Sequence, residues 1–304
     1  MNPLFVGSGV AIITPFDKEG QIDFERFSKL IEFQIANKTD AIIVCGTTGE
    51  GSTLSVEERL RLFSYAVHQV HGRVPIIAGT GSNSSFFTRD LALEAEKTGI
   101  DAHLIVTPYY NKTSQNGLVK HYNFLADRLS KPIVIYNVPS RTGMNIAPET
   151  YKELSLHKNI IAVKEADPDI SKLIKSISLC GDSLDFYIGN DDLISVSAYV
   201  GCKGVISVLS NILPAFTHKM TKAAITGNFE EANQMQAQAI ELIENLFCDV
   251  NPIPIKEAMR ILGYDTGYLR GPLCDLTTQK QNKLEAILYK YQPLITAENR
   301  VSLL

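Results

Sequence analysis

The sequence of 304 residues lacks a long apolar run, an excess of positive charge and a paired-cysteine motif. A membrane helix needs about 20 consecutive apolar residues, and no stretch of the chain approaches that length. The net charge of −4 does not favour nucleic acid or an anionic membrane surface as a partner. The first residues show no basic segment followed by an apolar stretch, so we expect no secretory signal.

The five cysteines are an odd number, and no two of them form a Cys-x-x-Cys pair. Reduced thiols in a cytoplasmic protein fit this pattern best. The six histidines are scattered, and none lies at metal-ligand spacing from a cysteine, so we expect no zinc site. With 45% hydrophobic and 20% charged residues, the composition is that of an ordinary soluble globular protein.

Eight short runs rich in valine and isoleucine recur along the chain. Each stays apolar rather than alternating, which is typical of strands buried on both faces of a parallel sheet. Helical patterns lie between them, and Ser55 with Glu58 predicts a capping box at the start of one helix. The predicted strands are Val10–Thr14, Ala41–Gly46, Pro75–Thr80, Ala102–Pro108, Pro132–Val138, Ile160–Glu165, Leu184–Asn190 and Gly204–Ser210.

The rest of the chain is predicted to be helical. A long amphipathic stretch covers Phe229–Phe247, and the segment Asn251–Pro254 interrupts the pattern with two prolines. A last helix is expected to begin near Thr278, with Gln281 completing a capping box.

Eight β-α units at intervals of about 20 to 35 residues match the length of a (β/α)₈ barrel. We therefore predict an α/β fold, with a catalytic TIM barrel over residues 1–228 and a C-terminal helical region over 229–304. The alternative, a doubly wound open sheet, needs fewer strands than the sequence offers.

Lys164 stands near the end of the buried run Ile160–Glu165. Burial disfavours the charged ammonium, and a neutral amine can attack a carbonyl carbon. This position therefore indicates Schiff-base chemistry. The alternative is a lysine that simply reaches solvent from the end of a strand.

Polar side chains follow several predicted strands at their C-terminal ends, where barrel enzymes carry their active sites. Hydroxyls, phenols, one guanidinium and one amine are expected to meet there: Thr47, Thr48, Tyr110, Tyr136, Arg141 and Lys164. The turn Gly46–Glu50 offers backbone N–H groups and two hydroxyls, which suits a carboxylate or phosphate. It also fits a tight turn capped by threonine.

The other polar residues at the predicted strand ends each allow two interpretations. Tyr110 and Tyr136 are candidates for proton transfer beside an imine-forming lysine, although tyrosine at a strand end is more often a packing residue. Arg141 suits a two-point contact with a carboxylate, or a surface ion pair. Asp191 and Asp192 would suit Mg²⁺, but adjacent side chains diverge in an extended segment, so we expect no metal site. His103, within a predicted strand, is expected to be a core residue.

Four motifs at these strand ends resemble the dihydrodipicolinate synthases, which belong to the N-acetylneuraminate lyase superfamily of class I aldolase-type barrels. The similarity runs essentially the whole length of the chain, and the second threonine, the tandem tyrosine and Arg141 favour the synthase over the sialic-acid lyase. The motifs are Gly46–Glu50, Tyr109–Asn111, Tyr136–Gly143 and Val163–Ala166.

The resemblance implies that Lys164 forms an imine with pyruvate, which then condenses with L-aspartate 4-semialdehyde in lysine and diaminopimelate biosynthesis. It implies that Thr47 and Thr48 hold the pyruvate carboxylate. Tyr136, Thr48 and Tyr110 would relay protons, with Tyr110 supplied by the neighbouring subunit of a homotetramer built as a dimer of dimers. The covalent imine on Lys164 would replace any cofactor or metal.

The resemblance also implies which residues bind the second substrate. Arg141 would bind the carboxylate of the semialdehyde at the entrance, and the backbones of Gly189 and Ile206 would shape the pocket.

The chain departs from the family pattern at several positions. Ile188 stands where many relatives have serine, Asp167–Asp169 replaces a small residue and a glycine, and Gly271 replaces a bulkier residue. These changes bear on the pocket floor and on the second substrate. Arg59 and Phe87 stand where lysine-sensitive relatives usually carry histidine and glutamate, so we expect no feedback inhibition by lysine.

From the residues alone, the sequence indicates a barrel enzyme that uses an imine-forming lysine on an oxo-acid. A sister enzyme that cleaves a sugar acid or a 2-keto-3-deoxy acid would use the same lysine. A metal-assisted enzyme would need the Asp191 pair, and a catalytically silent binding barrel would not require Lys164.

Overall fold

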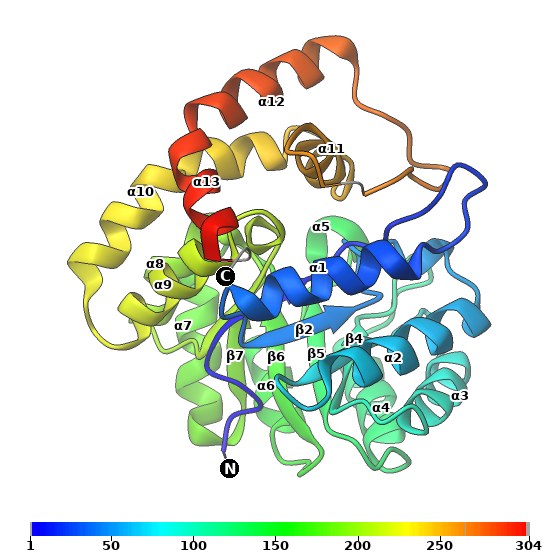
Figure 1. Cartoon of the computed structure of the whole chain (residues 1–304). Coiled ribbons are helices and arrows are strands. Elements are labelled where there is room, and N and C mark those ends of the chain that lie inside the picture. Colours follow the sequence, from blue (N-terminus) through cyan, green and yellow to red (C-terminus); the bar gives the residue numbers. More distant parts are fainter. Residues whose placement is uncertain (1, 265, 302–304) are drawn as a thin grey trace.

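The computed structural model describes residues 2–264 and 266–301, whose eight strands form a closed parallel barrel. Each strand pairs with the next along the chain, and the eighth pairs with the first (Figure 1). The predicted (β/α)₈ fold is confirmed. The strands are β1 (Gly7–Ala11), β2 (Ala41–Val44), β3 (Ile76–Gly79), β4 (Ala102–Val106), β5 (Ile133–Asn137), β6 (Ile160–Glu165), β7 (Asp185–Ile188) and β8 (Gly204–Ser207).

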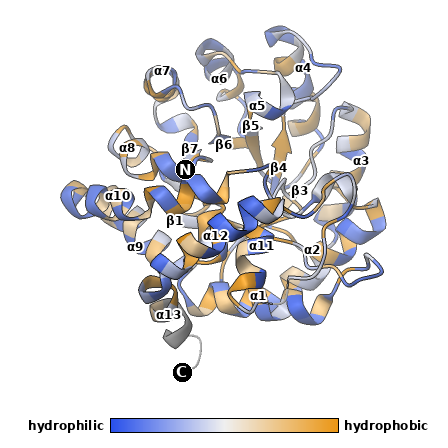
Figure 2. Cartoon of the chain, turned by 90° about the horizontal axis from the view of Figure 1, so that it is seen from above, coloured by the Kyte–Doolittle hydropathy of each residue, from blue (hydrophilic) through white to orange (hydrophobic). Residues whose placement is uncertain are grey.

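Helices alternate with the strands and form a ring around them, seen from above in Figure 2. Their apolar faces pack on the barrel, as in the second helix, where the side chains of Leu62, Phe63 and Ala66 are fully buried. None of the described helices is both long and apolar enough to cross a membrane. The helices of the ring are α1 (Phe24–Ala36), α2 (Val56–Val70), α3 (Ser85–Glu96), α4 (Gln115–Ala126), α5 (Pro139–Thr142), α6 (Pro148–Leu154), α7 (Ile170–Cys180), α8 (Ile194–Tyr199) and α9 (Pro214–Ile225).

A group of C-terminal helices follows the barrel and lies across one of its ends (Figure 1). The first of them begins at Phe229, as predicted. The capping box predicted at Ser55 is also confirmed, because its hydroxyl accepts from Glu58 N and the Glu58 carboxylate accepts from Ser55 N. The C-terminal helices are α10 (Phe229–Leu246), α11 (Ile253–Ile261), α12 (Thr278–Lys290) and α13 (Gln292–Val301).

The predicted first strand was wrong in its bounds. It was expected at Val10–Thr14 but spans Gly7–Ala11. The glycine and serine at its start carry no apolar signal, yet the backbones approach closely there, since a Cβ on Gly204 would lie 1.9 Å from Gly7 O. Ile13 is buried but lies beyond the strand, because its N–H donates to the Asn211 side chain instead of a neighbouring strand.

Two details of the C-terminal region also differ from the prediction. The cap of α12 is Thr277, whose hydroxyl accepts from Lys280 N, so Gln281 does not complete a capping box. A further helix, α13, follows the helix that was expected to be the last. Pro293 hides this helix in the sequence, although proline is well tolerated in a first helical turn.

The barrel interior is lined by alternate residues of each strand. Tyr136, Ala162, Tyr187 and Ile206 belong to one buried cluster inside the barrel. Lys164 lies two residues after Ala162 on β6 and therefore shares its inward face. This alternation places the Lys164 amine inside the barrel, at the carboxyl end of the strand.

A buried ion pair joins the barrel to the C-terminal region. Lys256 Nζ on α11 lies 2.7 Å from Glu50 Oε1 in the turn after β2, and side-chain exposures are 3% and 0%. Lys256 also donates to the carbonyl oxygens of Thr14 and Tyr268, at 3.0 and 2.6 Å. Burial lowers the pKa of Lys256, and the Glu50 carboxylate opposes that shift.

We predict that Lys256→Met will lower the free energy of unfolding by about 3–5 kcal/mol, because it leaves the Glu50 carboxylate buried without its partner. Lys29→Met is the matched control, since Lys29 pairs with Glu25 on the exposed surface of α1 and should leave the midpoint nearly unchanged. The measurement is the denaturant midpoint of both variants. A similar loss of stability in both variants would show that the buried Lys256–Glu50 pair contributes no more to stability than an exposed pair.

Candidate active site

A cavity of about 240 Å³ opens at the carboxyl ends of strands β2 to β5. Thr47, Tyr136 and Arg141 line it, together with Arg59 and Tyr109. This is the end of the barrel at which (β/α)₈ enzymes carry their active sites. The cavity therefore brings together side chains that the sequence places on three different strand ends.

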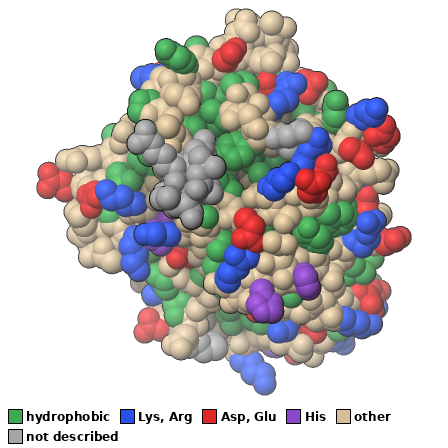
Figure 3. Space-filling view, viewed as in Figure 1, with side chains coloured by type: hydrophobic (Ala, Val, Ile, Leu, Met, Phe, Trp, Pro, Cys, Tyr) green, Lys and Arg blue, Asp and Glu red, His purple; other side chains and the backbone are tan. Residues whose placement is uncertain are grey.

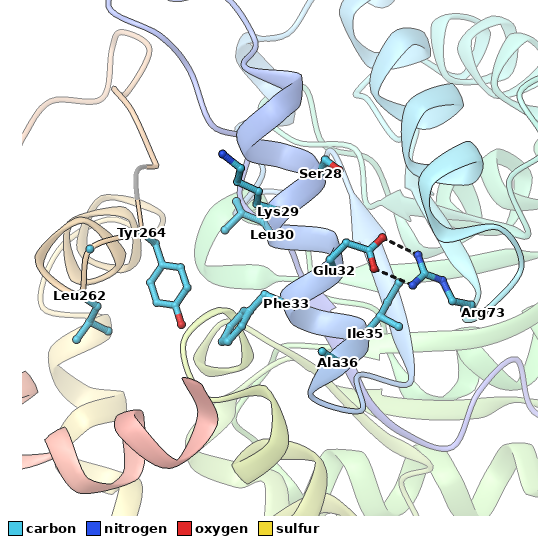
Figure 4. Close-up of a pocket in the computed structure, with 11 residues that line it drawn as sticks. Ser28, Lys29, Leu30, Glu32, Phe33, Ile35, Ala36, Arg73, Leu262 and Tyr264 are labelled. Atoms are coloured by element: carbon cyan, nitrogen blue, oxygen red, sulfur yellow. Dashed lines mark hydrogen bonds and ion pairs between the residues drawn. The ribbon is translucent and has the colours of Figure 1, made fainter. Parts of the chain in front are cut away.

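A larger groove of about 800 Å³ lies between α1 and the segment that follows α11 (Figure 4). Its Glu32 and Arg73 already pair, with two N–O distances of 2.7 and 2.8 Å. On the face drawn in Figure 3, positive and negative side chains are interspersed. The groove lies outside the barrel, so the smaller cavity is the better candidate for chemistry.

Lys164 and Tyr136 are neighbours on adjacent strands. Tyr136 lines the cavity, whereas Lys164 lies behind it and is not among the lining residues. The register pairs Tyr136 of β5 with Lys164 of β6. Lys164 Nζ lies 4.5 Å from the centroid of the Tyr136 ring, and each residue is 6% exposed. Within the described part of the chain, Lys164 forms no ion pair. The amine is thus buried against the face of the phenol ring.

Gly189 lies next to this lysine, and Ile206 belongs to the buried interior of the barrel. A Cβ on Gly189 would be only 3.0 Å from Lys164 Cε, so the residue after β7 has to be very small. Ile206 on β8 is fully buried in the same interior cluster as Tyr136. Gly189 therefore limits the space next to the amine.

The two threonines of the turn after β2 differ in exposure and in their contacts. Thr47 is half-buried and lines the cavity. Thr48 is 2% exposed, and its Oγ1 accepts a hydrogen bond of 2.9 Å from Asn251 Nδ2. Glu50, which closes the turn, has a φ of 53°, and its N–H donates to Thr47 O.

Arg141 lies in the short helix α5, which follows β5, and is exposed at the cavity. Its Nη2 donates to the main-chain oxygen of Asn251 at 3.1 Å. A guanidinium has five N–H donors, so most of its capacity is left for a ligand. This geometry suits a carboxylate that enters from solvent.

The two adjacent tyrosines, Tyr109 and Tyr110, differ in exposure and in their relation to the cavity. Tyr109 lines the cavity and is 36% exposed, whereas Tyr110 is 92% exposed and is not among the lining residues. Tyr110 has a φ of 71°, a conformation that is uncommon for a bulky residue. This chain alone therefore does not bring the Tyr110 phenol to Lys164.

Arg59 on α2 adds a second guanidinium to the cavity. Its Nε is buried, and no described group accepts a hydrogen bond from it. Burial lowers the pKa of Arg59. The cavity wall is therefore electropositive at this point.

Asp191 and Asp192 diverge, as the sequence analysis expected. Asp191 is buried, and its Oδ2 accepts from Val208 N at 2.9 Å and Leu209 N at 2.8 Å, whereas Asp192 is exposed. Burial raises the pKa of Asp191. Among residues 2–264 and 266–301, no group of three or more histidine, cysteine or acidic side chains is arranged to hold a metal.

His103 is confirmed as a core residue. It is fully buried on β4, and its ring nitrogens lie 3.3 Å from the Thr80 hydroxyl and 3.2 Å from the Glu96 carboxylate. Both nitrogens have partners, so this histidine has no role in the cavity.

A buried amine, a phenol, two hydroxyls and a guanidinium suit one type of chemistry. The amine can add to the carbonyl of an oxo-acid, and the phenol and hydroxyls can move the protons. A model of the dihydrodipicolinate synthetase family matches residues 4–291 of the chain.

The chain belongs to this family. A curated relative, the 4-hydroxy-tetrahydrodipicolinate synthase of Thermoanaerobacter sp. (strain X514), is 47% identical over 95% of this chain and 97% of its own. Dihydrodipicolinate synthase from Aquifex aeolicus superposes with a TM-score of 0.93 at 40% identity, covering 95% and 98% of the two chains. The chloride-inhibited enzyme from Acinetobacter baumannii, complexed with pyruvate, gives 0.91 at 38% identity, covering 93% and 98%.

Asn251 was not predicted to be a site residue. It was interpreted only as the start of a segment that interrupts a helix, yet it contacts both Thr48 and Arg141. Asn251 is 203 residues from Thr48 along the chain, so no local spacing relates the two. The local sequence marks Asn251 only as the residue before Pro252, in a segment that breaks the helical pattern.

Proposed function

We propose that this chain is a 4-hydroxy-tetrahydrodipicolinate synthase, a lyase that condenses pyruvate with L-aspartate 4-semialdehyde. The observation that carries the proposal is the Lys164 amine, buried at the carboxyl end of β6 with its Nζ 4.5 Å from the Tyr136 ring centroid. The 47% identity to a relative of that name over 95% of the chain supports it.

The reaction begins when the neutral Lys164 amine attacks the C2 carbonyl of pyruvate. The nitrogen gives up two protons, the carbonyl oxygen leaves as water, and a C=N bond forms. Transfer of a proton from C3 to the imine nitrogen gives an enamine, whose C3 attacks the aldehyde carbon of the second substrate while the aldehyde oxygen takes up a proton and becomes a hydroxyl. The amino group of that substrate then adds to C2, its two protons pass to the Lys164 nitrogen, and the bond from C2 to Lys164 breaks, so that a cyclic C=N bond forms and Lys164 is released as the amine.

Hydroxyl groups near the amine carry the protons in this proposal. Tyr136, Thr48 and Tyr110 form the relay, and Thr47 and Thr48 hold the pyruvate carboxylate. Support comes from Thr47 and Tyr136, which line one cavity, and from the position of Tyr136 beside Lys164. Lys164 supplies the covalent link, so the proposal requires no cofactor or metal.

Arg141 binds the carboxylate of the semialdehyde at the entrance. Its exposure and its free N–H donors support this role. The backbones of Gly189 and Ile206 bound the pocket on the other side, where the close approach of Gly189 to Lys164 leaves little space.

We also propose that the chain acts as a homotetramer, a dimer of dimers in which Tyr110 completes the site of a neighbouring subunit. Tyr110 is 92% exposed, and the next residue, Asn111, donates to Asn83 O just before α3. Phe86 and Phe87 at the start of α3 are 62% and 44% exposed. Large exposed apolar side chains on neighbouring segments favour an interface between proteins.

The first test is covalent trapping. Borohydride with pyruvate should add mass to Lys164 alone, because reduction locks the imine, and Lys164→Ala should abolish the adduct. Peptide mass spectrometry identifies the modified residue, and turnover with the semialdehyde should survive exhaustive chelation. An adduct on another lysine would contradict the assignment. Turnover with a sugar-derived aldehyde in place of the semialdehyde would favour the sister lyases.

The second test concerns Tyr110. Tyr110→Phe should lower kcat by about 10²–10⁴-fold, the usual contribution of a proton-transfer group, with little change in stability because the side chain is exposed. Tyr289→Phe, which alters a tyrosine that is 82% exposed on α12, is the control. Mixed dimers of Tyr110→Phe and Thr48→Val subunits should regain activity. Confirmed mixed dimers without activity would refute donation between subunits.

The third test concerns lysine. We expect millimolar L-lysine to leave the initial rate unchanged, because a cationic ligand beside Tyr109 would meet the unpaired Arg59 guanidinium. Phe87 offers no carboxylate in compensation, and a lost charge-assisted hydrogen bond costs about 1.5–3 kcal/mol, or roughly tenfold or more in affinity. Half-inhibition at sub-millimolar lysine would overturn this expectation.

A further inference from the structure

Asn251 contacts two groups of the candidate site at once. Its Nδ2 donates to Thr48 Oγ1 at 2.9 Å, and its main-chain oxygen accepts from Arg141 Nη2 at 3.1 Å. The residue is 6% exposed. A single residue of the C-terminal region therefore connects the turn after β2 with the helix after β5.

The backbone around Asn251 is held in place from both directions. Ile253 N donates to Val250 O at 2.8 Å, and Lys256 N donates to Pro252 O at 3.0 Å. Lys256 in turn pairs with Glu50, two residues after Thr48. These contacts on both sides of Asn251 hold its side-chain amide next to Thr48.

The direction of this hydrogen bond matters for the chemistry of Thr48. A hydroxyl has one proton to donate and two lone pairs that accept. Because Asn251 donates to it, Thr48 Oγ1 is occupied as an acceptor, and its own proton is left for another group. In the proposed function, that group is the pyruvate carboxylate. Asn251 Oδ1 is buried and has no partner among the described groups.

We propose that Asn251 is a positioning residue for the reaction. Its side chain orients Thr48 as a donor toward the pyruvate carboxylate, and its main-chain oxygen holds Arg141 at the entrance. The kinetic part of this proposal rests on the proposed function. The contact with Thr48 can be tested without any activity.

The side chain and the main chain of Asn251 predict different effects on the two substrates. Asn251→Ala removes the bond to Thr48 but leaves the carbonyl that holds Arg141. It should therefore raise the KM for pyruvate, or slow borohydride trapping, by about three- to tenfold, the equivalent of one hydrogen bond. The KM for the semialdehyde should change by less than about twofold.

A double-mutant cycle tests whether Asn251 acts through Thr48. In a Thr48→Val background, Asn251→Ala should raise the KM for pyruvate by less than about twofold more, because the contact between the two side chains is already lost. Asn251→Asp should reduce activity more than Asn251→Ala, since an ionised carboxylate can only accept and would receive the Thr48 hydrogen bond in place of the substrate carboxylate. Asn245→Ala is the matched control, because Asn245 is a 5% exposed asparagine of α10 that bonds Glu241 O.

The same cycle measured on thermal unfolding separates this proposal from the proposed function. Coupling between Asn251 and Thr48 in unfolding, together with normal kinetics in Asn245→Ala, would support the contact. Equal increases in both KM values, or full additivity with Thr48→Val, would reduce Asn251 to a structural residue and overturn the proposal. A wild-type protein that does not trap pyruvate would refute the proposed function instead, and the unfolding cycle would still test the contact.

Discussion

Closure of the eight-stranded parallel ladder is the constraint on which the rest of the structure depends. The ladder closes where β8 meets β1, and there Gly204 and Gly7 approach so closely that side chains are excluded. Closure fixes the register of every strand. That register sets Tyr136 beside Lys164 and Lys164 beside Tyr187, and it turns these side chains into the barrel.

The C-terminal region supports the site from outside the barrel. The Lys256–Glu50 pair is buried, and both Lys256 and Arg270 lie over the ring of Phe16, at 4.6 and 4.3 Å from its centroid. Buried charges stabilise a fold only when their geometry is well satisfied. Here each charge has a partner, and together they hold the turn that carries Thr47 and Thr48. The barrel supplies the reactive groups, and the C-terminal region restrains one of their loops.

The strands and most helices were predictable because their signals are local. A buried parallel strand is apolar along its length, so β6 was predicted at its observed bounds, Ile160–Glu165. The start of β1 was not predictable in this way, because Gly7 and Ser8 pair through the backbone and have no apolar side chains. Similarly, α13 was missed because Pro293 in its first turn looks like an interruption.

The sequence by itself determined the order of the elements, the buried position of Lys164 and the set of polar residues at the strand ends. These follow from local hydrophobic patterns and from the rule that barrel sites lie at carboxyl ends. Only the tertiary structure decided which of the two threonines lines the cavity: Thr47 does, while Thr48 accepts a hydrogen bond from Asn251. It also decided that Arg59 Nε has no acceptor among the described groups, and that Tyr110 is exposed and does not line the cavity of its own chain. The reason is that each of these depends on contacts between segments far apart in the chain, for which no spacing in the sequence gives a signal.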